Sequence, residues 1–341
     1  MISTASIIFL FLPLVISAPA FPPSAELLQG KVNENITLIA GGGTPNVSEA
    51  GLSGFTPAGI TGLQLLATLE NIEAFFYSDA IHNLTNGIFT TEPSIFDDVV
   101  DVISKIAAQE EVHVATVSGV LLESSAPVIP PCNYTFPSTT FEEFLAVANL
   151  LTSANLGSVI GAQEQLGTSN PSIGPSTTAI LGAETRHDAF LRILHGLVPN
   201  PAPFDTAIPI AWAYNIGLSF IVPGSCPVEV ALPTYPALKE DPTLPWAFAN
   251  ATYPETMSFS WDNQQVWVVR ETGKQLYAAW LNQFNQPVYT PVTKLGAGSG
   301  IAAVPKGMNG VAYVALTTQQ PATFDDLQTA TLVGPLAVAV T

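Results

Sequence analysis

The sequence predicts a mainly α protein, in which a bundle of four long helices and a fifth apolar helix precede a smaller β-rich C-terminal region. Four stretches between about residues 56 and 198 repeat apolar residues at helical spacing, with Pro- and Gly-containing breaks between them. A very apolar fifth stretch follows. After Cys226 the pattern changes to alternating runs rich in Val, Tyr, Thr and Trp, which favour strands.

The N-terminal segment, residues 1–20, is typical of a secretory signal peptide. Its apolar run from Ile7 to Ile16 is too short to span a bilayer as a helix. Small residues around Ala18 to Ala20 form a cleavage site, although no basic residue precedes the apolar run. Residues 21–54 contain Gly, Pro and Asn without strong periodicity, and we expect an irregular arm there.

The helical domain is expected over residues 55–226. Thr56 is a natural N-cap and Pro57 a natural first helical residue, so the first helix is expected to begin there. The apolar periodicity predicts the remaining four helices at about Ser94–Leu122, Thr140–Leu166, Ser176–Val198 and Thr206–Val222.

The C-terminal region, residues 227–341, begins with a Pro-rich linker that extends to about Pro254. Alternating runs follow, and Asn309-Gly310 is typical of a hairpin turn. We expect a small β-sandwich-like domain.

The composition excludes some classes of binding partner. Of the 341 residues, 48% are hydrophobic and only 11% are charged, and the formal net charge is −18. Such an acidic surface repels phosphate backbones and anionic lipids, so neither nucleic acid nor a membrane surface is an expected partner. No membrane span is expected either, because the most apolar later stretch, Ala207 to Val222, carries Pro209 and Asn215.

Export is also indicated by the sequons and the cysteines. Five asparagines lie in Asn-x-Ser/Thr sequons and are candidates for glycosylation: Asn35, Asn46, Asn83, Asn133 and Asn250. The only two cysteines, Cys132 and Cys226, have a single intramolecular pairing, and a disulfide is expected in an oxidising compartment. Two buried free thiols are the alternative.

Polar side chains interrupt the apolar faces of three predicted helices. On a helical wheel Glu111 falls outside the apolar stripe and Glu73 lies at its margin. Five other residues lie within the stripes, and four of them form two Glu-x-x-His pairs: Glu70, Glu110, His113, Glu184 and His187.

This pattern predicts a metal site. Residues three apart on a helix lie one above the other, so a Glu-x-x-His pair can reach one ion. Several buried carboxylates require protons or a cation, and oxygen and imidazole ligands suit iron or manganese. The alternative is that each histidine is an ordinary core residue. His82 and His195 are interpreted as ordinary surface or core histidines.

The motifs "LATLENIEAFFY", "AAQEEVHVAT", "PPCNYTFP", "AETRHDAFLR" and "PAPFDTAIPIAWAYNIGLSFIVPGSCPVEV" resemble those of secreted fungal ferritin-like proteins of the stress-response or late-sexual-development type. The resemblance runs from about Gly51 to Val230. It implies a ferritin-like bundle with a di-metal carboxylate site. It also favours Glu70 over Glu73 as the ligand, because Tyr77 follows Glu70 by seven residues. Glu110 and Glu184 are then expected to bridge the ions, with Glu70 terminal.

One position departs from the family pattern. Where ferritin-like proteins place a glutamate on the third helix, this chain has Thr152, with Asn155 nearby as a weak oxygen ligand or a holder of water. Two functions therefore remain open. The chain is a secreted glycoprotein whose iron or manganese site acts on oxygen or peroxide, or it is a non-catalytic cell-wall or interaction protein that has lost its metals. No catalytic residue and no oligomeric state is predicted.

Overall fold

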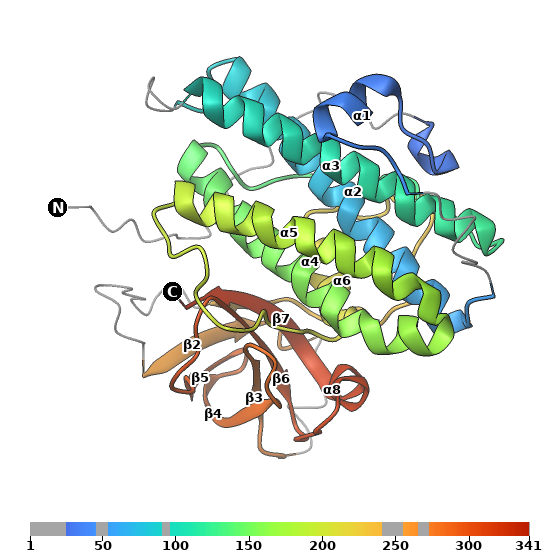
Figure 1. Ribbon diagram of the computed structural model, residues 1–341. Helices are drawn as coiled ribbons and strands as arrows, with labels where there is room; N and C mark the ends of the chain where they lie inside the picture. The colour runs from blue at the N-terminus through green and yellow to red at the C-terminus, as the bar shows by residue number, and fades with distance from the viewer. Residues whose placement is uncertain (1–24, 46–53, 91–95, 241–254, 265–272, 341) are drawn as a thin grey trace.

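The computed structural model describes residues 25–45, 54–90, 96–240, 255–264 and 273–340. The helices stack above a C-terminal sheet, and the N-terminal α1 lies at the side away from that sheet (Figure 1). Seven α-helices are described: α1 (Glu34–Ala40), α2 (Pro57–Thr85), α3 (Phe96–Glu123), α4 (Phe141–Ser169), α5 (Gly174–Leu194), α6 (Ile210–Leu218) and α8 (Phe324–Ala330).

Helices α2 and α4 each begin at an N-cap residue that can be recognised in the sequence. At the start of α2 the Thr56 hydroxyl accepts a hydrogen bond from the Gly59 N–H, and Pro57 occupies the first turn, as predicted. At the start of α4 the side chains of Thr140 and Glu143 each bond to the other's backbone N–H. These reciprocal bonds satisfy N–H groups that have no partner within a helix.

The four long helices α2 to α5 form a layer in which α2 packs against both α3 and α4, and α4 packs against α5. Helix α2 is buried on nearly all of its faces from Leu63 to Tyr77. Helix α4 is the one described helix that is long and apolar enough to cross a membrane, but 78% of its apolar window is buried inside the protein. Packing within the layer accounts for that composition, and the sequence-based choice of Ala207–Val222 as the nearest candidate was wrong.

The N-terminal arm is not irregular throughout, which corrects the prediction for residues 21–54. Within its described part, Asn33 caps α1 by accepting a hydrogen bond from the Ile36 N–H. Ile36 and Ala40 then pack against Ala108 of α3. At seven residues, α1 is too short for its apolar period to be recognised in the sequence.

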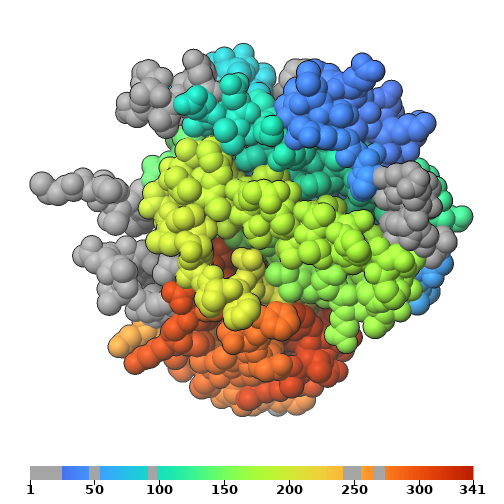
Figure 2. Space-filling model, viewed as in Figure 1, coloured from blue at the N-terminus to red at the C-terminus, as the bar shows by residue number. Residues whose placement is uncertain are grey.

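Helix α6 is shorter than predicted, because the 206–222 stretch is not helical before Ile210 and ends in a turn after Leu218. At its start, Ile208 donates its backbone N–H to the carbonyl of Gly157 on α4. A Cβ atom on Gly157 or Gly161 would collide with the backbone of Thr206 or Ile208, so these two glycines let that segment lie directly on α4. In Figure 2 the residues that follow α5, drawn in yellow, lie between the helices and the sheet.

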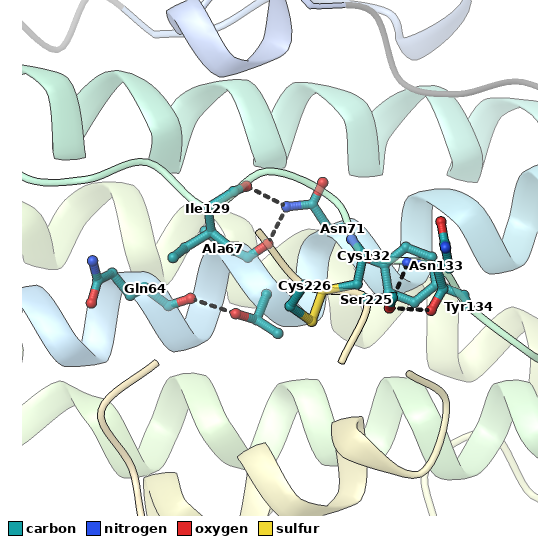
Figure 3. Close-up of a disulfide and its surroundings, with 10 residues drawn as sticks. Gln64, Ala67, Asn71, Ile129, Cys132, Asn133, Tyr134, Ser225 and Cys226 are labelled. Carbon is teal, nitrogen blue, oxygen red and sulfur yellow. Dashed lines mark hydrogen bonds between the residues drawn. A yellow bond between two sulfur atoms is a disulfide. The ribbon is translucent and has the colours of Figure 1, made fainter. Parts of the chain in front are cut away.

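A disulfide between Cys132 and Cys226 joins the α3–α4 connection to the segment after α6, and it confirms the predicted pairing. Figure 3 shows its surroundings. The Asn71 amide on α2 donates to the carbonyls of Ala67 and Ile129, which fixes the same connection to the helical layer. The two linked segments also pair through an isolated bridge between Tyr134 and Ile221.

The C-terminal strands form one seven-stranded antiparallel sheet in the order β1-β2-β5-β4-β3-β6-β7. The prediction of a sandwich-like arrangement was wrong, because β4 pairs with both β3 and β5 and so joins the two halves into one ladder. The strands are β1 (Leu238–Glu240), β2 (Thr256–Trp261), β3 (Tyr277–Leu281), β4 (Val288–Gly296), β5 (Ser299–Ala303), β6 (Val311–Thr317) and β7 (Thr331–Ala339).

The sheet has its own core on one face and packs against the helices with the other. In β6 successive side chains alternate between the two, so Tyr313 and Ala315 join the helical core while Val314 and Leu316 join the sheet core. The turn at Asn309-Gly310 leads from β5 into β6, which do not pair with each other. It is therefore not the predicted hairpin, although Gly310 does have positive φ.

Candidate metal centre

Three of the four long helices bring acidic and imidazole side chains to one buried point. Helix α2 contributes Glu70, α3 contributes Glu110 and His113, and α5 contributes Glu184. One potential ligand atom from each of these four residues lies within 4.8 Å of the corresponding atoms of the others. Glu110 and Glu184 are fully buried, so the chain shields this cluster from water. All four residues were predicted from the apolar faces of their helices.

The two shared carboxylates each face both histidines. Glu110 Oε2 lies 3.0 Å from His113 Nδ1, and Glu110 Oε1 lies 2.9 Å from His187 Nδ1. Glu184 Oε1 lies 2.9 Å from His113 Nδ1, and Glu184 Oε2 lies 3.4 Å from His187 Nδ1. Each carboxylate thus turns one oxygen toward each imidazole. The arrangement divides into two halves, which we call the His113 half-site and the His187 half-site.

Glu70 belongs to the His113 half-site. Its Oε2 lies 3.3 Å from His113 Nδ1. The His113 half-site therefore has three carboxylates around one imidazole nitrogen: Glu70, Glu110 and Glu184.

The residues present fit a bound cation. Several inward-facing atoms are buried and face only one another across the cluster: Glu70 Oε2, Glu110 Oε1, both oxygens of Glu184 and His187 Nδ1. One proton on each Nδ1 cannot satisfy all of the carboxylate oxygens that face it, and native proteins rarely leave several buried oxygens without a donor at one point. Metal ions of intermediate hardness such as iron and manganese take this combination of carboxylate oxygen and imidazole nitrogen.

The ring of His187 is held in one orientation by Gln109 of α3. Gln109 Nε2 donates to the carbonyl of Ala40 in α1 at 3.0 Å, which fixes the amide orientation and leaves Oε1 toward His187. Since that oxygen only accepts, His187 Nε2 must carry the proton of the 2.7 Å bond between them. In a neutral ring Nδ1 then keeps its lone pair toward the carboxylates. This contact by α1 was not anticipated from the sequence.

The metal-free cluster stores protons. Burial raises the pKa of Glu70 to about 8, against the opposing effect of His113. Burial lowers the pKa of His187, but the charges of Glu110 and Glu184 outweigh it and raise the value to about 10. His113 is raised well above its ordinary pKa in the same way, mainly by Glu70. Burial alone would raise the pKa of Glu110, but the two histidines hold it below its usual range.

Glu73 is the residue that sequence reasoning misplaced. The helical wheel put it at the margin of the apolar face, whereas the structure buries it completely. Thr152 Oγ1 donates to Glu73 Oε1 at 3.1 Å, and Asn155 Nδ2 donates to Glu73 Oε2. Because α2 is surrounded on nearly all sides, its marginal positions also face protein. The apolar residues on all faces of α2 were the feature of the sequence that could have predicted the burial of Glu73.

Thr152 and Asn155 lie on α4 near the cluster, and both are fully buried. Neither contributes a carboxylate, and Asn155 presents its amide nitrogen rather than its oxygen to Glu73. The Tyr77 hydroxyl lies 2.8 Å from Thr152 Oγ1. Tyr77, Thr152 and Glu73 therefore form one chain of hydrogen-bonded groups.

The candidate glycosylation sites divide into three groups. Asn35 and Asn133 are exposed, and they remain predictions. Asn83 is only 8% exposed and its Nδ2 donates to Asp79, so the folded chain does not present the nitrogen that would carry a glycan, and this candidate is withdrawn. Asn46 and Asn250 lie outside the described residues, as does the expected signal peptide.

Comparison with known proteins points to the same part of the chain. Residues 59–197 match the ferritin-like domain family. The matched range contains all six buried acidic and histidine residues discussed above: Glu70, Glu73, Glu110, His113, Glu184 and His187. The chain is also 25% identical over 303 residues to Protein rds1 of Schizosaccharomyces pombe, covering 78% of this chain and 73% of the yeast protein.

Proposed function

We propose that the protein is a secreted ferritin-like glycoprotein, associated with stress or development, whose helices form a four-helix bundle around a two-metal carboxylate site. One observation carries the proposal: Glu110 and Glu184 each turn one oxygen to His113 and the other to His187. A carboxylate placed in this way can bridge two ions. Separate ordinary core histidines would not require both carboxylates to face both rings.

The chain's own residues have distinct roles in such a site. Glu110 and Glu184 would be the ligands shared by both ions, Glu70 would bind at the His113 half-site, and each histidine would hold one ion through Nδ1. Bound iron or manganese would supply redox chemistry toward oxygen or peroxide. The surrounding apolar side chains exclude water and strengthen each electrostatic interaction. Gln109 keeps the proton on His187 Nε2 and so leaves Nδ1 for the ion.

Several observations support secretion. The N-terminal 20 residues have the pattern of a signal peptide. The Cys132–Cys226 disulfide is the kind of bond that persists in an oxidising compartment. Asn35 and Asn133 are exposed sequon asparagines. The association with stress or development is supported by the family resemblance of the sequence motifs and by the similarity to Protein rds1.

The test is metal analysis of the secreted full-length protein, together with peroxide turnover. The wild type is expected to hold about two iron or manganese ions per chain, because two half-sites are present. Replacing both bridging residues, Glu110→Gln with Glu184→Gln, should remove both ions and the turnover. Glu111→Gln is the matched control, since Glu111 adjoins Glu110 but makes no contact with the cluster. Unchanged metal content in the double variant would rule out the site.

A second candidate function is favoured by Thr152, which stands where the resemblance implies a glutamate. On this alternative the bundle has lost its chemistry, and the protein acts through its surface in the cell wall or in contact with another protein. Such a protein should contain no metal even after anaerobic reconstitution with Fe²⁺ or Mn²⁺. It should also tolerate apolar replacement of the whole buried cluster, because paired apolar groups can substitute for buried ion pairs.

A further inference from the structure

The His187 half-site lacks a terminal carboxylate in the set of ligands considered so far. The His113 half-site has Glu70 in addition to the two bridging residues, 3.3 Å from the imidazole nitrogen. At the His187 half-site, Glu110 and Glu184 are the only carboxylates among the described residues that pair with the ring. With Thr152 uncharged, three carboxylates would have to neutralise two divalent ions, and one positive charge would stay buried without a counter-charge.

Glu73 is a further buried carboxylate, and it lies beside the two α4 residues Thr152 and Asn155. It is one turn beyond Glu70 on α2 and fully buried. Burial raises the pKa of Glu73 well above its usual range, and the charges of Glu184, Glu110 and Glu70 raise it further. Two α4 side chains, Thr152 and Asn155, hold its carboxyl group on the side of the cluster that faces α4. Helix α4 is the one on which this chain has Thr152 in place of the glutamate that the family resemblance implies.

We propose that Glu73 is the terminal carboxylate of the His187 half-site, so that α2 supplies both terminal carboxylates and α4 supplies only their positioning. This inference rests on the two-metal function proposed above. Glu70, Glu73, Glu110 and Glu184 would together carry four negative charges, which balance two divalent ions when both imidazoles are neutral. The site is then complete without a glutamate on α4.

The hydrogen bonds around Glu73 are compatible with metal binding. Each carboxylate oxygen has two acceptor positions, so an oxygen that accepts from Thr152 or Asn155 still has one free for an ion. The single hydroxyl proton of Thr152 points to Glu73, and Tyr77 therefore donates to Thr152. This fixed direction makes Thr152 a positioning residue, because it orients the carboxylate without replacing it.

The test is titration of the metal-free full-length protein with Mn²⁺, followed by calorimetry and by elemental analysis after removal of unbound metal. Wild type should bind about two ions. Glu73→Gln should bind about one, with the first affinity retained, and its electron paramagnetic resonance should change from a coupled pair to an isolated Mn²⁺. Glu111→Gln is the control and should bind as wild type does.

The outcomes separate this inference from the proposed function. Two ions in wild type and two of unchanged affinity in Glu73→Gln would overturn the role of Glu73 while leaving the metal site standing. One ion in wild type would overturn the role of Glu73 by removing the second ion. No metal in wild type would overturn both proposals.

A second pair of variants applies if Glu73→Gln does not fold. Thr152→Val removes the hydroxyl donor at nearly constant volume, and Thr152→Ser keeps it. The second ion should bind about 10- to 100-fold more weakly in Thr152→Val, the range typical of lost outer-sphere partners. The first ion should be unaffected, and Thr152→Ser should restore the second. Equal second-ion affinities in the wild type and Thr152→Val would contradict the positioning role and, with it, the assignment of Glu73.

Discussion

At the scale of single residues, protonation decides what the buried cluster can bind. Glu70, His113 and His187 all have pKa values above their ordinary ones, so they hold protons near neutral pH when no metal is present. A metal ion must displace these protons. The same side chains therefore carry protons without metal and would serve as ligands with it.

The metal-free protein is expected to lose stability as pH rises from about 4.5 to 10. Glu70 has a folded-state pKa of about 8, above its ordinary value of 4.5, so the stability it contributes is complete below 4.5 and is lost as pH passes through 8. His187, raised from 6.5 to about 10, acts in the same direction. In thermal melts of the metal-free protein, the unfolding midpoint should fall by more than about 3 °C over this pH range.

Two controls test whether the buried cluster causes the pH dependence of the unfolding midpoint. Metal-loaded protein should show a smaller fall, because the ligands have already lost their protons. Glu70→Gln should remove the part of the fall that lies between about pH 4.5 and pH 8. A midpoint that is independent of pH in the metal-free wild type would contradict the assigned protonation states.

Gln109 is expected to control metal affinity without touching the metal. Gln109→Leu leaves the His187 Nε2–H without its acceptor, so the ring is no longer held with Nδ1 toward the carboxylates. Metal affinity should fall about 10- to 100-fold, as measured by calorimetric titration. Gln109→Glu keeps an acceptor for His187 but loses the donor to Ala40, so it should restore most of the affinity.

The control for Gln109 is Gln64→Leu. Gln64 also donates from its amide to a backbone carbonyl, that of Pro127, but has no contact with the cluster. Its replacement should leave metal affinity unchanged. If Gln109→Leu also bound metal as tightly as wild type, the orientation of His187 would not depend on this amide.

At the scale of elements, small residues let helices and segments approach closely. Gly157 and Gly161 of α4 lie directly against the extended segment that leads into α6. The apolar stretch over residues 206–222, predicted as one helix, is therefore divided into a segment that lies on α4 and the short helix α6. The contact fixes the position of α6 between the helical layer and the sheet.

Gly161→Ala is expected to destabilise the protein by about 1–3 kcal/mol, since the new methyl group would overlap the backbone of Ile208. Gly167→Ala on the same helix has nothing within 4 Å of the added atom. It should be neutral or stabilise α4 by up to about 1 kcal/mol, because alanine favours helix. Chemical denaturation of both variants checks the difference, and equal stabilities would show that the segment can move away from α4.

At the scale of the whole molecule, the Cys132–Cys226 disulfide closes a loop that contains α4, α5 and α6, with a sequence separation of 94 between the two cysteines. The paired variant Cys132→Ser with Cys226→Ser is expected to lower the free energy of unfolding by about 2–5 kcal/mol, since loops of this length gain much entropy when opened. Denaturant unfolding with and without a reducing agent measures this loss. The double variant should not respond to the reductant, and an equally stable double variant would contradict the expectation.

The helices were largely predictable because they depend on local sequence. Thr56, Pro57 and Thr140 mark helix starts through hydrogen bonds made within a few residues. Apolar periodicity likewise placed Glu110 and Glu184 on core faces. The sheet was less predictable, because the partner of a strand is chosen by distant residues. Nothing local in Asn309-Gly310 reveals that β5 and β6 do not pair.

By itself, the sequence determined where the long helices begin, which carboxylates and histidines face inward, and that the two cysteines could pair only with each other. These properties follow from spacing and count along one chain. Only the tertiary structure decided that α1 reaches His187 through Gln109, that Glu73 is buried against Thr152 and Asn155, and that Asn83 is covered. Burial of a position at the margin of a helix depends on how many neighbours surround that helix, and a single helix pattern does not contain that information.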